Sequence, residues 1–258
     1  MVISFYFSPT GHTKTVCQNI AQAIDKDYKD YPFTTPKERT APALTPEDIV
    51  VVGIPTYAGR VPNLLLPYLQ SVAFHGARCI LVATFGNRDY DDSLLELFDI
   101  VRKNGGKVYG CGAFSCEHSF SNTLAEGRPD ASDMKDVEAF ARGALKNIRE
   151  GRTLSRPDRA VRPYYTPRDR HGKGINFVKI KPKTDPDRCT DCKICVDLCP
   201  LGTIHYDDVS RVEKCMKCCA CVKGCPESAK YFDDPAYLYH KEELEAMYSA
   251  RHDNHVFL

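Results

Sequence analysis

Neither sign of charge dominates this sequence, because 35 Lys and Arg residues stand against 34 Asp and Glu residues, for a formal net charge of +1. A dedicated nucleic-acid-binding protein normally has a clear basic excess, so we expect no nucleic-acid partner. Long hydrophobic runs are also missing. The longest have the length of a strand, well short of the roughly 20 apolar residues of a membrane-spanning helix, so we expect no membrane span.

Sequence motifs for nucleotides and for export are missing as well. Neither G-x-G-x-x-G nor G-x4-G-K-S/T occurs, so the sequence predicts no separate NAD(P)H site and no nucleoside triphosphate site. The N-terminal stretch MVISFYF is apolar, but it has no basic region before it and no small-residue cleavage site after it. We interpret it as a buried strand instead of a signal peptide, and we expect a cytoplasmic protein.

What is present is a chain of 258 residues, 43% hydrophobic and 27% charged, which suits a medium domain followed by a small one. In residues 1–150, short apolar runs alternate with amphipathic stretches. The predicted strands are 2–7, 48–55, 77–85 and 107–114, with a weaker one near 28–31, and the predicted helices are 12–24, 61–73, 91–103 and 132–149. Strands that are apolar throughout suit a parallel sheet covered on both faces. We therefore predict an α/β domain with a doubly wound, five-stranded parallel sheet.

Residues 151–180 change in character, because Lys, Arg and Pro become frequent and periodicity weakens. We interpret this segment as a basic connector between two domains. It is either solvated along its length or forms a collar that recruits an acidic electron-donor protein. One short strand is expected within it, at 175–180.

The last part of the chain contains an internal repeat. CTDCKICVDLCPLGTIHYDD (189–208) aligns with CMKCCACVKGCPESAKYFDD (215–234) at an offset of 26 residues. The cysteines, the Cys-Pro pairs and the closing Asp-Asp pairs coincide, which indicates a duplicated supersecondary unit. We assign residues 181–235 to a small α+β domain and residues 236–258 to a C-terminal helix and tail.

Both copies follow C-x2-C-x2-C-x3-C-P, which is the bacterial ferredoxin signature for two 4Fe–4S clusters. In two-cluster ferredoxins, the fourth cysteine of each run binds the cluster of the other run. The ligands predicted for the first cluster are Cys189, Cys192, Cys195 and Cys225. Those predicted for the second are Cys215, Cys218, Cys221 and Cys199. Cys219 is left over.

Two other uses of these cysteines are weaker. Zinc sites usually pair two C-x2-C units a dozen or more residues apart, with no third step and no Cys-Pro pair. A disulfide framework is disfavoured because no export signal precedes the cluster of cysteines. Cys17, Cys79, Cys111 and Cys116 lie outside the repeat, and we interpret them as buried apolar side chains, as is Cys219. Nearby lysines are either solvated or form a docking face for an acidic partner: Lys193, Lys214, Lys217, Lys223 and Lys230.

The first strand ends in FSPTGHTKTV, where three hydroxyl residues and a glycine precede a predicted helix. Free backbone N–H groups at a helix start, together with the helix dipole, form a cup for phosphate. The sequence S-x-T-G-x-T at this position resembles the FMN-phosphate loop of flavodoxins. The resemblance implies phosphate binding by Ser8, Thr10, Gly11, His12 and Thr13.

Two later loops strengthen this resemblance. PTYAGRVPN (55–63) and FGNRDYDD (85–92) each follow a strand beside the switch point of the sheet, where doubly wound folds bind ligands. In flavodoxins the equivalent loops enclose the isoalloxazine ring. The resemblance implies that one face is lined by Pro55, Thr56, Tyr57, Ala58 and Gly59, and the other by Phe85, Gly86, Asn87 and Tyr90.

Over nearly its full length, the chain resembles the flavodoxin-domain/ferredoxin-domain fusion family of anaerobic bacteria and archaea. The resemblance implies FMN and two 4Fe–4S clusters as cofactors, and a redox partner protein such as a ferredoxin, a flavoprotein or a reductase. Three functions stay open: an electron carrier, an FMN-dependent reductase of a small organic substrate, and an iron–sulfur redox sensor. A carrier is favoured because no substrate motif is recognisable, and we assign no catalytic residue. A homodimer is one of the oligomeric states left open.

Overall fold

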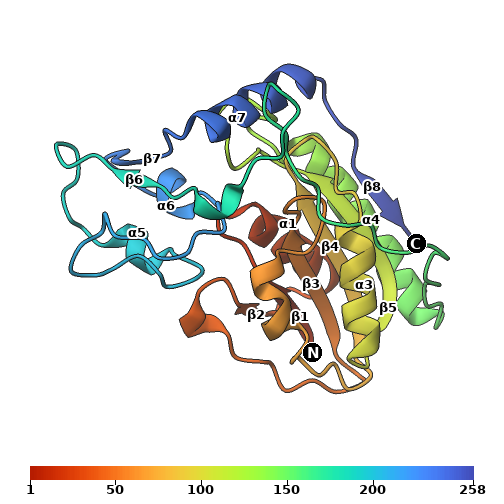
Figure 1. Cartoon of the computed structure of the whole chain (residues 1–258). Coiled ribbons are helices and arrows are strands. Elements are labelled where there is room, and N and C mark those ends of the chain that lie inside the picture. Colours follow the sequence, from red (N-terminus) through yellow and green to blue (C-terminus); the bar gives the residue numbers. More distant parts are fainter.

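The computed structural model describes residues 1–258, and its N-terminal part is built on a parallel sheet. Its strands lie in the order β2-β1-β3-β4-β5, which is the flavodoxin-like order of a doubly wound fold (Figure 1). Their bounds are β1 Val2–Tyr6, β2 Lys29–Pro32, β3 Ile49–Pro55, β4 Arg78–Phe85 and β5 Lys107–Ser115. The predicted five-stranded parallel sheet is confirmed, and each of the five strands predicted for it overlaps an observed one.

Helices cover both faces of this sheet, because its central strands are apolar on both sides. One face packs against α1 (His12–Ile24) and α4 (Ala131–Arg149) in a core of 15 buried residues. The other packs against α2 (Leu66–Leu69) and α3 (Ser93–Lys103) in a core of 26 buried residues. The helix predicted at 61–73 is shorter than expected. It consists of a 3-10 turn at Asn63–Leu65 followed by α2, with Pro62 and Pro67 restricting the backbone there.

The C-terminal segment adds to the sheet in a way that the sequence did not predict. Helix α7 (Pro235–Met247) runs back over the N-terminal part, and strand β8 (His255–Phe257) pairs antiparallel with β5. In Figure 1 the dark blue tail follows this course from α7 to the edge of the sheet. The strand predicted at 175–180 is wrong, since these residues contain a 3-10 helix at Phe177–Lys179, capped by the Asn176 side chain.

The cysteine repeat forms a small lobe of its own. A two-stranded antiparallel sheet joins β6 (Lys183–Thr184) and β7 (Lys230–Tyr231), and two short helices pack together, α5 (Ile194–Asp197) and α6 (Ala220–Lys223). The two copies of the repeat share the same left-handed backbone conformation at aligned positions. The aligned residues Lys193 and Cys219, each just before a helix, have φ values of 64° and 60°. The duplication seen in the sequence is therefore a duplication of structure.

Two sets of contacts join the small lobe to the sheet domain. The Lys223 ammonium donates to Glu117 Oε1 at 2.8 Å and to Asn122 Oδ1 at 2.6 Å, in the loop after β5. At the other side, the Arg39 guanidinium donates to the carbonyl of Pro200. The lobe is thus fixed beside the carboxyl ends of the parallel strands. None of the helices combines the length and the apolar character that a crossing of the bilayer requires.

Candidate cofactor sites

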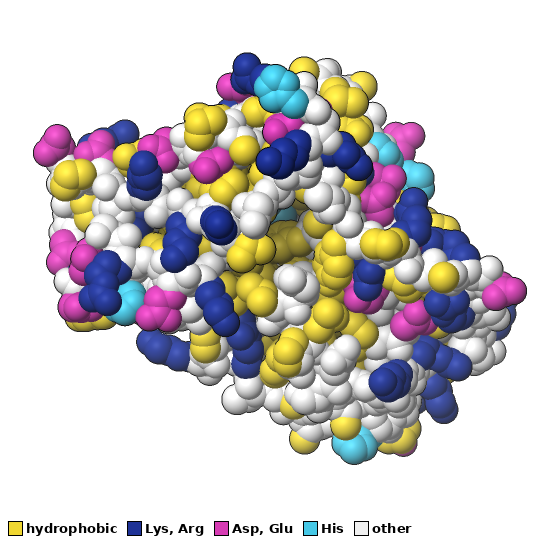
Figure 2. All heavy atoms as spheres, in the orientation of Figure 1, with side chains coloured by type: hydrophobic (Ala, Val, Ile, Leu, Met, Phe, Trp, Pro, Cys, Tyr) yellow, Lys and Arg dark blue, Asp and Glu magenta, His cyan; other side chains and the backbone are white.

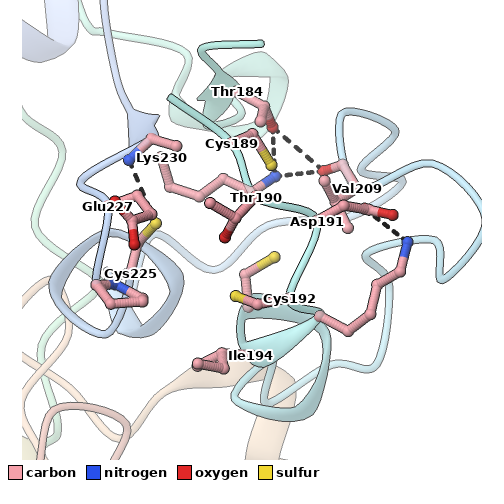
Figure 3. Close-up of a pocket in the computed structure, with 14 residues that line it drawn as sticks. Thr184, Cys189, Thr190, Asp191, Cys192, Ile194, Val209, Cys225, Glu227 and Lys230 are labelled. Carbon is pink, nitrogen blue, oxygen red and sulfur yellow. Dashed lines mark hydrogen bonds and ion pairs between the residues drawn. The ribbon is translucent and has the colours of Figure 1, made fainter. Parts of the chain in front are cut away.

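The first cysteine-lined cavity draws residues from both copies of the repeat. Its lining includes Cys189, Cys192 and Cys195 from the first copy and Cys225 from the second. In Figure 3 the side chains of Cys189, Cys192 and Cys225 lie around one space. Cys192 is exposed, so this cavity lies close to the surface.

A second cysteine-lined cavity has the complementary composition. Its lining includes Cys215, Cys218 and Cys221 from the second copy and Cys199 from the first. Cys219 also lies in this wall, where its Sγ is 3.4 Å from the Tyr237 hydroxyl. Apolar side chains close the rest of the cavity, among them Ile204 and Phe232.

The donors in both cavities are soft thiols, and each cavity offers three in the C-x2-C-x2-C arrangement plus one from the other copy. This is the donor set that an iron–sulfur cubane requires, so the residues present fit such a group. No set of three or more His, Cys, Asp or Glu side chains is grouped closely enough to hold a single metal ion. All thirteen cysteines are free thiols in the structure.

The lysines near the cavities are largely engaged within the protein. Lys230 is 3% exposed and donates to Thr184 Oγ1 at 2.7 Å, while Lys217 is 9% exposed and donates to the Cys215 carbonyl at 2.8 Å. Lys193 pairs with Asp191 at 2.7 Å, and Lys223 joins the two lobes. Of the five lysines that the sequence offered as a docking face, Lys214 is the one that is exposed without an ion pair.

The predicted phosphate loop forms a tight turn between β1 and α1. Gly11 has φ = +90°, a conformation that suits glycine, and directly precedes the helix. The Ser8 hydroxyl accepts a hydrogen bond from the Lys14 N–H at 2.9 Å, and the Thr13 hydroxyl is bonded to that of Thr84 at 2.7 Å. The backbone N–H groups of His12 and Thr13 donate to no acceptor in the protein, which leaves the cup open for an anion.

A large cavity of about 570 Å³ lies between the sheet domain, the small lobe, the connector and α7. Figure 2 shows it as a hollow near the centre of this face, with hydrophobic side chains inside and Lys and Arg side chains beside it. Of the predicted flavin-binding residues, Thr56, Tyr57, Ala58, Gly59 and Gly86 line it. Cys215 lines it too, so this cavity and the second cysteine-lined cavity share a wall.

The other predicted ring-binding residues are not among the residues that line this cavity. Pro55 lies at the end of β3, while Phe85 is 2% exposed and packs against His252 of the tail. Tyr90 packs against His255. Asn87 is 2% exposed, and its amide donates to the carbonyls of Tyr248 and Ala250 at 2.6 and 2.8 Å. The C-terminal tail therefore covers part of the loop that follows β4.

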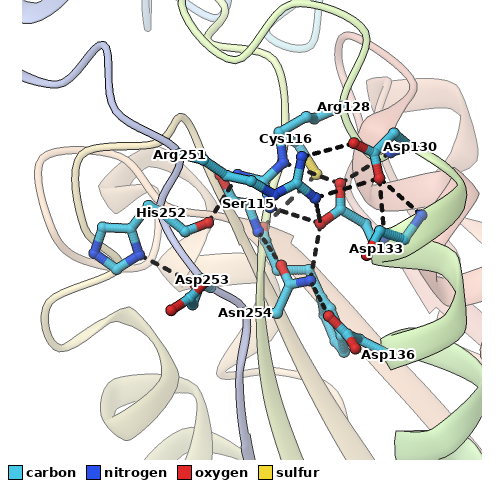
Figure 4. Close-up of polar contacts among 12 residues, drawn as sticks. Ser115, Cys116, Arg128, Asp130, Asp133, Asp136, Arg251, His252, Asp253 and Asn254 are labelled. Atoms are coloured by element: carbon cyan, nitrogen blue, oxygen red, sulfur yellow. Dashed lines mark hydrogen bonds and ion pairs between the residues drawn. The ribbon is translucent and has the colours of Figure 1, made fainter.

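A buried ion-pair network holds the tail in this position. The Arg128 guanidinium makes two hydrogen bonds to the Asp133 carboxylate, at 2.9 and 2.6 Å, and donates to the His252 carbonyl at 2.8 Å. Arg251 and Asn254 of the tail also donate to Asp133, each at 2.9 Å. Figure 4 shows these side chains meeting at the N-terminus of α4, where a negative charge is favoured by the helix dipole.

The connector contributes residues to the large cavity that sequence reasoning missed. Tyr165 donates its N–H to the Ala58 carbonyl at 2.8 Å, and the Tyr164 hydroxyl donates to the Val61 carbonyl at 2.8 Å. Arg159 and Arg162 form ion pairs with Asp92, which is 1% exposed at its side chain. The connector is therefore docked on the sheet domain over much of its length. Beyond their hydrophobic character, nothing in the sequence indicated that the connector tyrosines would line a cavity.

Burial sets the electrostatics inside the large cavity. It raises the pKa of Tyr57 well above its ordinary value and lowers the pKa of His118 to about 4, so both side chains are neutral near pH 7. His240, from α7, is a further lining residue whose pKa is lowered by burial. Tyr57 and His118 are thus neutral hydrogen-bonding groups in a lining that also contains charged side chains, among them Arg88 and Lys214.

Comparisons with known proteins match both parts of the chain. Residues 182–205 match the model of a family described as a 4Fe-4S binding domain, a range that contains the four cysteines of the first copy of the repeat. Flavodoxin 1 from Bacillus cereus is 16% identical and covers 56% of this chain and 97% of its own, with a TM-score of 0.41. A Fusobacterium nucleatum flavodoxin bound to flavin mononucleotide is 20% identical, and the match covers 56% of this chain and 96% of the flavodoxin, with a TM-score of 0.40. No curated protein matches the chain.

The strand order identifies the fold of the N-terminal part, and the matched family identifies a domain in the C-terminal part. The N-terminal part has a flavodoxin-like α/β fold, and the C-terminal part contains a 4Fe–4S binding domain. Rubredoxin oxygen:oxidoreductase from Desulfovibrio gigas is another similar structure, at 13% identity and a TM-score of 0.40, of which the matched region covers 36%. That region covers 57% of this chain.

Proposed function

We propose that this chain is an electron-transfer protein of the flavodoxin-domain/ferredoxin-domain fusion type, with one FMN and two 4Fe–4S clusters. The observation that carries the proposal is the composition of the two cysteine-lined cavities. Each takes three cysteines from one copy of the repeat and one from the other, the arrangement known for two-cluster ferredoxins. The ligands would be Cys189, Cys192, Cys195 and Cys225 for the first cluster, and Cys215, Cys218, Cys221 and Cys199 for the second.

FMN binding is supported by two separate features. The open N–H groups at the start of α1 and the hydroxyls of Ser8 and Thr10 would hold its phosphate. The loop Thr56–Gly59 and Gly86 would then border its ring in the large cavity. Bound FMN exchanges one or two electrons and an iron–sulfur cluster exchanges one, so the pair converts between one- and two-electron chemistry.

The residues of this chain have positioning roles in the proposed transfer. Cys215 lies in the wall shared by the second cysteine-lined cavity and the large cavity, so the second cluster would be the one nearer to the flavin. Apolar side chains such as Met216 fill that wall and would exclude water from it. The first cluster, beside the exposed Cys192, would exchange electrons with a redox partner protein in the cytoplasm.

Reduction by a low-potential ferredoxin tests this proposal. Reduced ferredoxin, added without oxygen to the cofactor-loaded protein, is expected to bleach the cluster absorbance and then the flavin absorbance. Substituting two residues of the phosphate loop, as Thr10→Ala with Thr13→Ala, should lower flavin content while the clusters remain reducible. Clusters that become reduced while bound flavin stays oxidised would show that the two cofactor sites are not connected.

A further inference from the structure

The large cavity admits a small molecule but no folded protein. The connector closes one side through the backbone hydrogen bond of Tyr165 to Ala58 and the Tyr164 hydroxyl bond to Val61, both at 2.8 Å. Helix α7 closes another side with His240 and Leu244. Its volume of about 570 Å³ falls within the usual range for small-molecule sites, about 300–1,000 Å³. A partner protein would therefore approach the clusters of the small lobe more easily than it would enter this cavity.

The aromatic part of the walls favours a flat ligand, while charged residues such as Arg88 and Lys217 line the rest. Aromatic side chains line three sides, with Phe120 from the sheet domain, Tyr164 and Phe177 from the connector, and Tyr57 from the loop after β3. Two apolar residues of the lining are also exposed to solvent, Leu64 at 40% and Val178 at 81%. Exposed apolar groups that continue into an aromatic cavity are typical of an entrance for organic molecules.

The ring of His118 offers a hydrogen-bond donor to this cavity. The Phe120 N–H donates to Nδ1 of His118 at 3.1 Å, so the neutral ring carries its proton on Nε2. His118 lines the cavity, and the hydrogen bond that its ring makes uses Nδ1 and leaves Nε2 free for a ligand. The ring is held in place, because a Cβ at Gly86 would overlap it. Since burial lowers the pKa of His118 to about 4, the donor is a neutral imidazole near pH 7.

We propose that this cavity binds a planar, unsaturated carbonyl compound, an enal, enone or quinone, whose carbonyl oxygen accepts a hydrogen bond from Nε2 of His118. The proposal rests on the proposed function, because the flavin loop Thr56–Gly59 borders the same space. A neutral imidazole that polarises a carbonyl is a known electrophilic group in enzymes. The chain would then be a reductase that receives its electrons through the clusters.

The electrons and protons of the reaction balance as follows. A reduced iron–sulfur donor protein would supply two electrons, one at a time. The cysteines of the two cavities and the loop Thr56–Gly59 would hold the groups that carry these electrons. The C=C bond of an enal takes up these two electrons and two protons from solvent, and one C–H bond forms at each carbon. The donor protein is oxidised twice, and the product is the saturated aldehyde. His118 positions and polarises the carbonyl and gives up no net proton.

trans-Cinnamaldehyde is a suitable probe, because it is planar and its reduction product, 3-phenylpropanal, is not. We expect the anaerobic, cofactor-loaded protein to perturb the flavin absorbance on binding cinnamaldehyde, and to consume it when reduced ferredoxin is supplied. His118→Phe should weaken binding by about three- to tenfold, the amount expected for one hydrogen bond to a neutral group. His118→Gln, which keeps an N–H donor near the position of Nε2, should recover most of the binding.

A second variant tests the cavity without touching His118. Val178→Trp adds bulk at the exposed entrance, on a residue that is 81% exposed, and should raise KM for cinnamaldehyde with little change in flavin or iron content. Equal binding by the wild type, His118→Phe and Val178→Trp would overturn the inference.

The outcomes separate this inference from the proposed function. Protein that contains flavin and iron and is bleached by ferredoxin, but neither binds nor consumes cinnamaldehyde, contradicts the substrate site alone. Protein without flavin or iron contradicts the proposed function itself. A His118→Phe variant that shifts the flavin spectrum but leaves KM unchanged would show that Nε2 bonds to the flavin, and that outcome also overturns the assignment of His118 to the substrate.

Discussion

Cys225 belongs to the second cysteine run in the sequence but lies beside the first run in space. It follows Cys221 by four residues, yet it lines the cavity formed by Cys189, Cys192 and Cys195. The reason is the pairing of β6 with β7, which brings the end of the second copy beside the start of the first. The crossed arrangement makes the two cavities depend on one another for folding.

A substitution at Cys225 tests this crossing. Cys225→Ala should remove the cluster held by Cys189, Cys192 and Cys195, and leave the cluster of its own run in place. Electron paramagnetic resonance of the reduced protein, with iron analysis, would report about half of the wild-type iron. Cys219→Ala is the matched control, and both clusters are expected to remain. Loss of the cluster of the second run in Cys225→Ala would contradict the crossed assignment.

Among elements, the C-terminal tail depends most on one buried group, Asp133 at the start of α4. Its side chain is 0% exposed and accepts hydrogen bonds from Arg128, Arg251 and Asn254. Asp133→Asn would leave the Arg128 charge buried without a counter-ion, which we expect to lower the free energy of unfolding by about 3–5 kcal/mol. Urea unfolding of the cofactor-loaded protein measures this change.

The matched control lies on the same helix. Glu138 pairs with Arg142 at 3.7 Å, with both side chains more than half exposed, so Glu138→Gln should cost less than about 1 kcal/mol. Similar effects of Asp133→Asn and Glu138→Gln would show that the network around Asp133 contributes little to stability.

The ionisation of Asp133 also predicts a dependence on pH. Burial by itself would raise the pKa of Asp133, but hydrogen bonds from Arg128, the Asp130 backbone and Asn254 bring it below the ordinary value. A lowered folded-state pKa adds stability that is complete above the unfolded pKa of about 4 and is lost as the pH falls further. The stability difference between wild type and Asp133→Asn should therefore narrow below about pH 4.

At the scale of elements, sequence reasoning succeeded where a period was clear. The apolar runs at 48–55 and 77–85 suit buried strands of a parallel sheet, and helix 12–24 was predicted with its observed bounds. The prediction failed at 175–180, where the largely apolar INFVKI resembles a strand but the Asn176 side chain caps a 3-10 turn. Strand β8 has three residues, too few for any period to identify it.

Within the candidate site, the sequence predicts the cysteine ligands but not the walls of the large cavity, and this difference has a physical reason. Cysteine spacing predicts a ligand set because short loops limit which thiols can surround one cluster. The walls of the large cavity come from segments far apart in the sequence, including those of Tyr165 and His240, and no local pattern in the sequence brings these together. Tertiary packing alone places them beside Tyr57.

For the molecule as a whole, three cavities follow one another through the structure. The first cysteine-lined cavity is at the outer side of the small lobe, beside the exposed Cys192. The second shares the wall around Cys215 with the large cavity, and the large cavity is closed by the connector and α7. A route for electrons from a partner protein to an enclosed site would follow this order.

Cofactor content measures the central claim most directly. Iron, acid-labile sulfide and flavin should be determined on protein prepared without oxygen, together with its absorbance spectrum. Two cubanes and one flavin predict about eight iron atoms, about eight sulfides and about one FMN per chain. Zinc in place of iron, about four iron atoms, or protein that binds no FMN even when FMN is added would contradict the account.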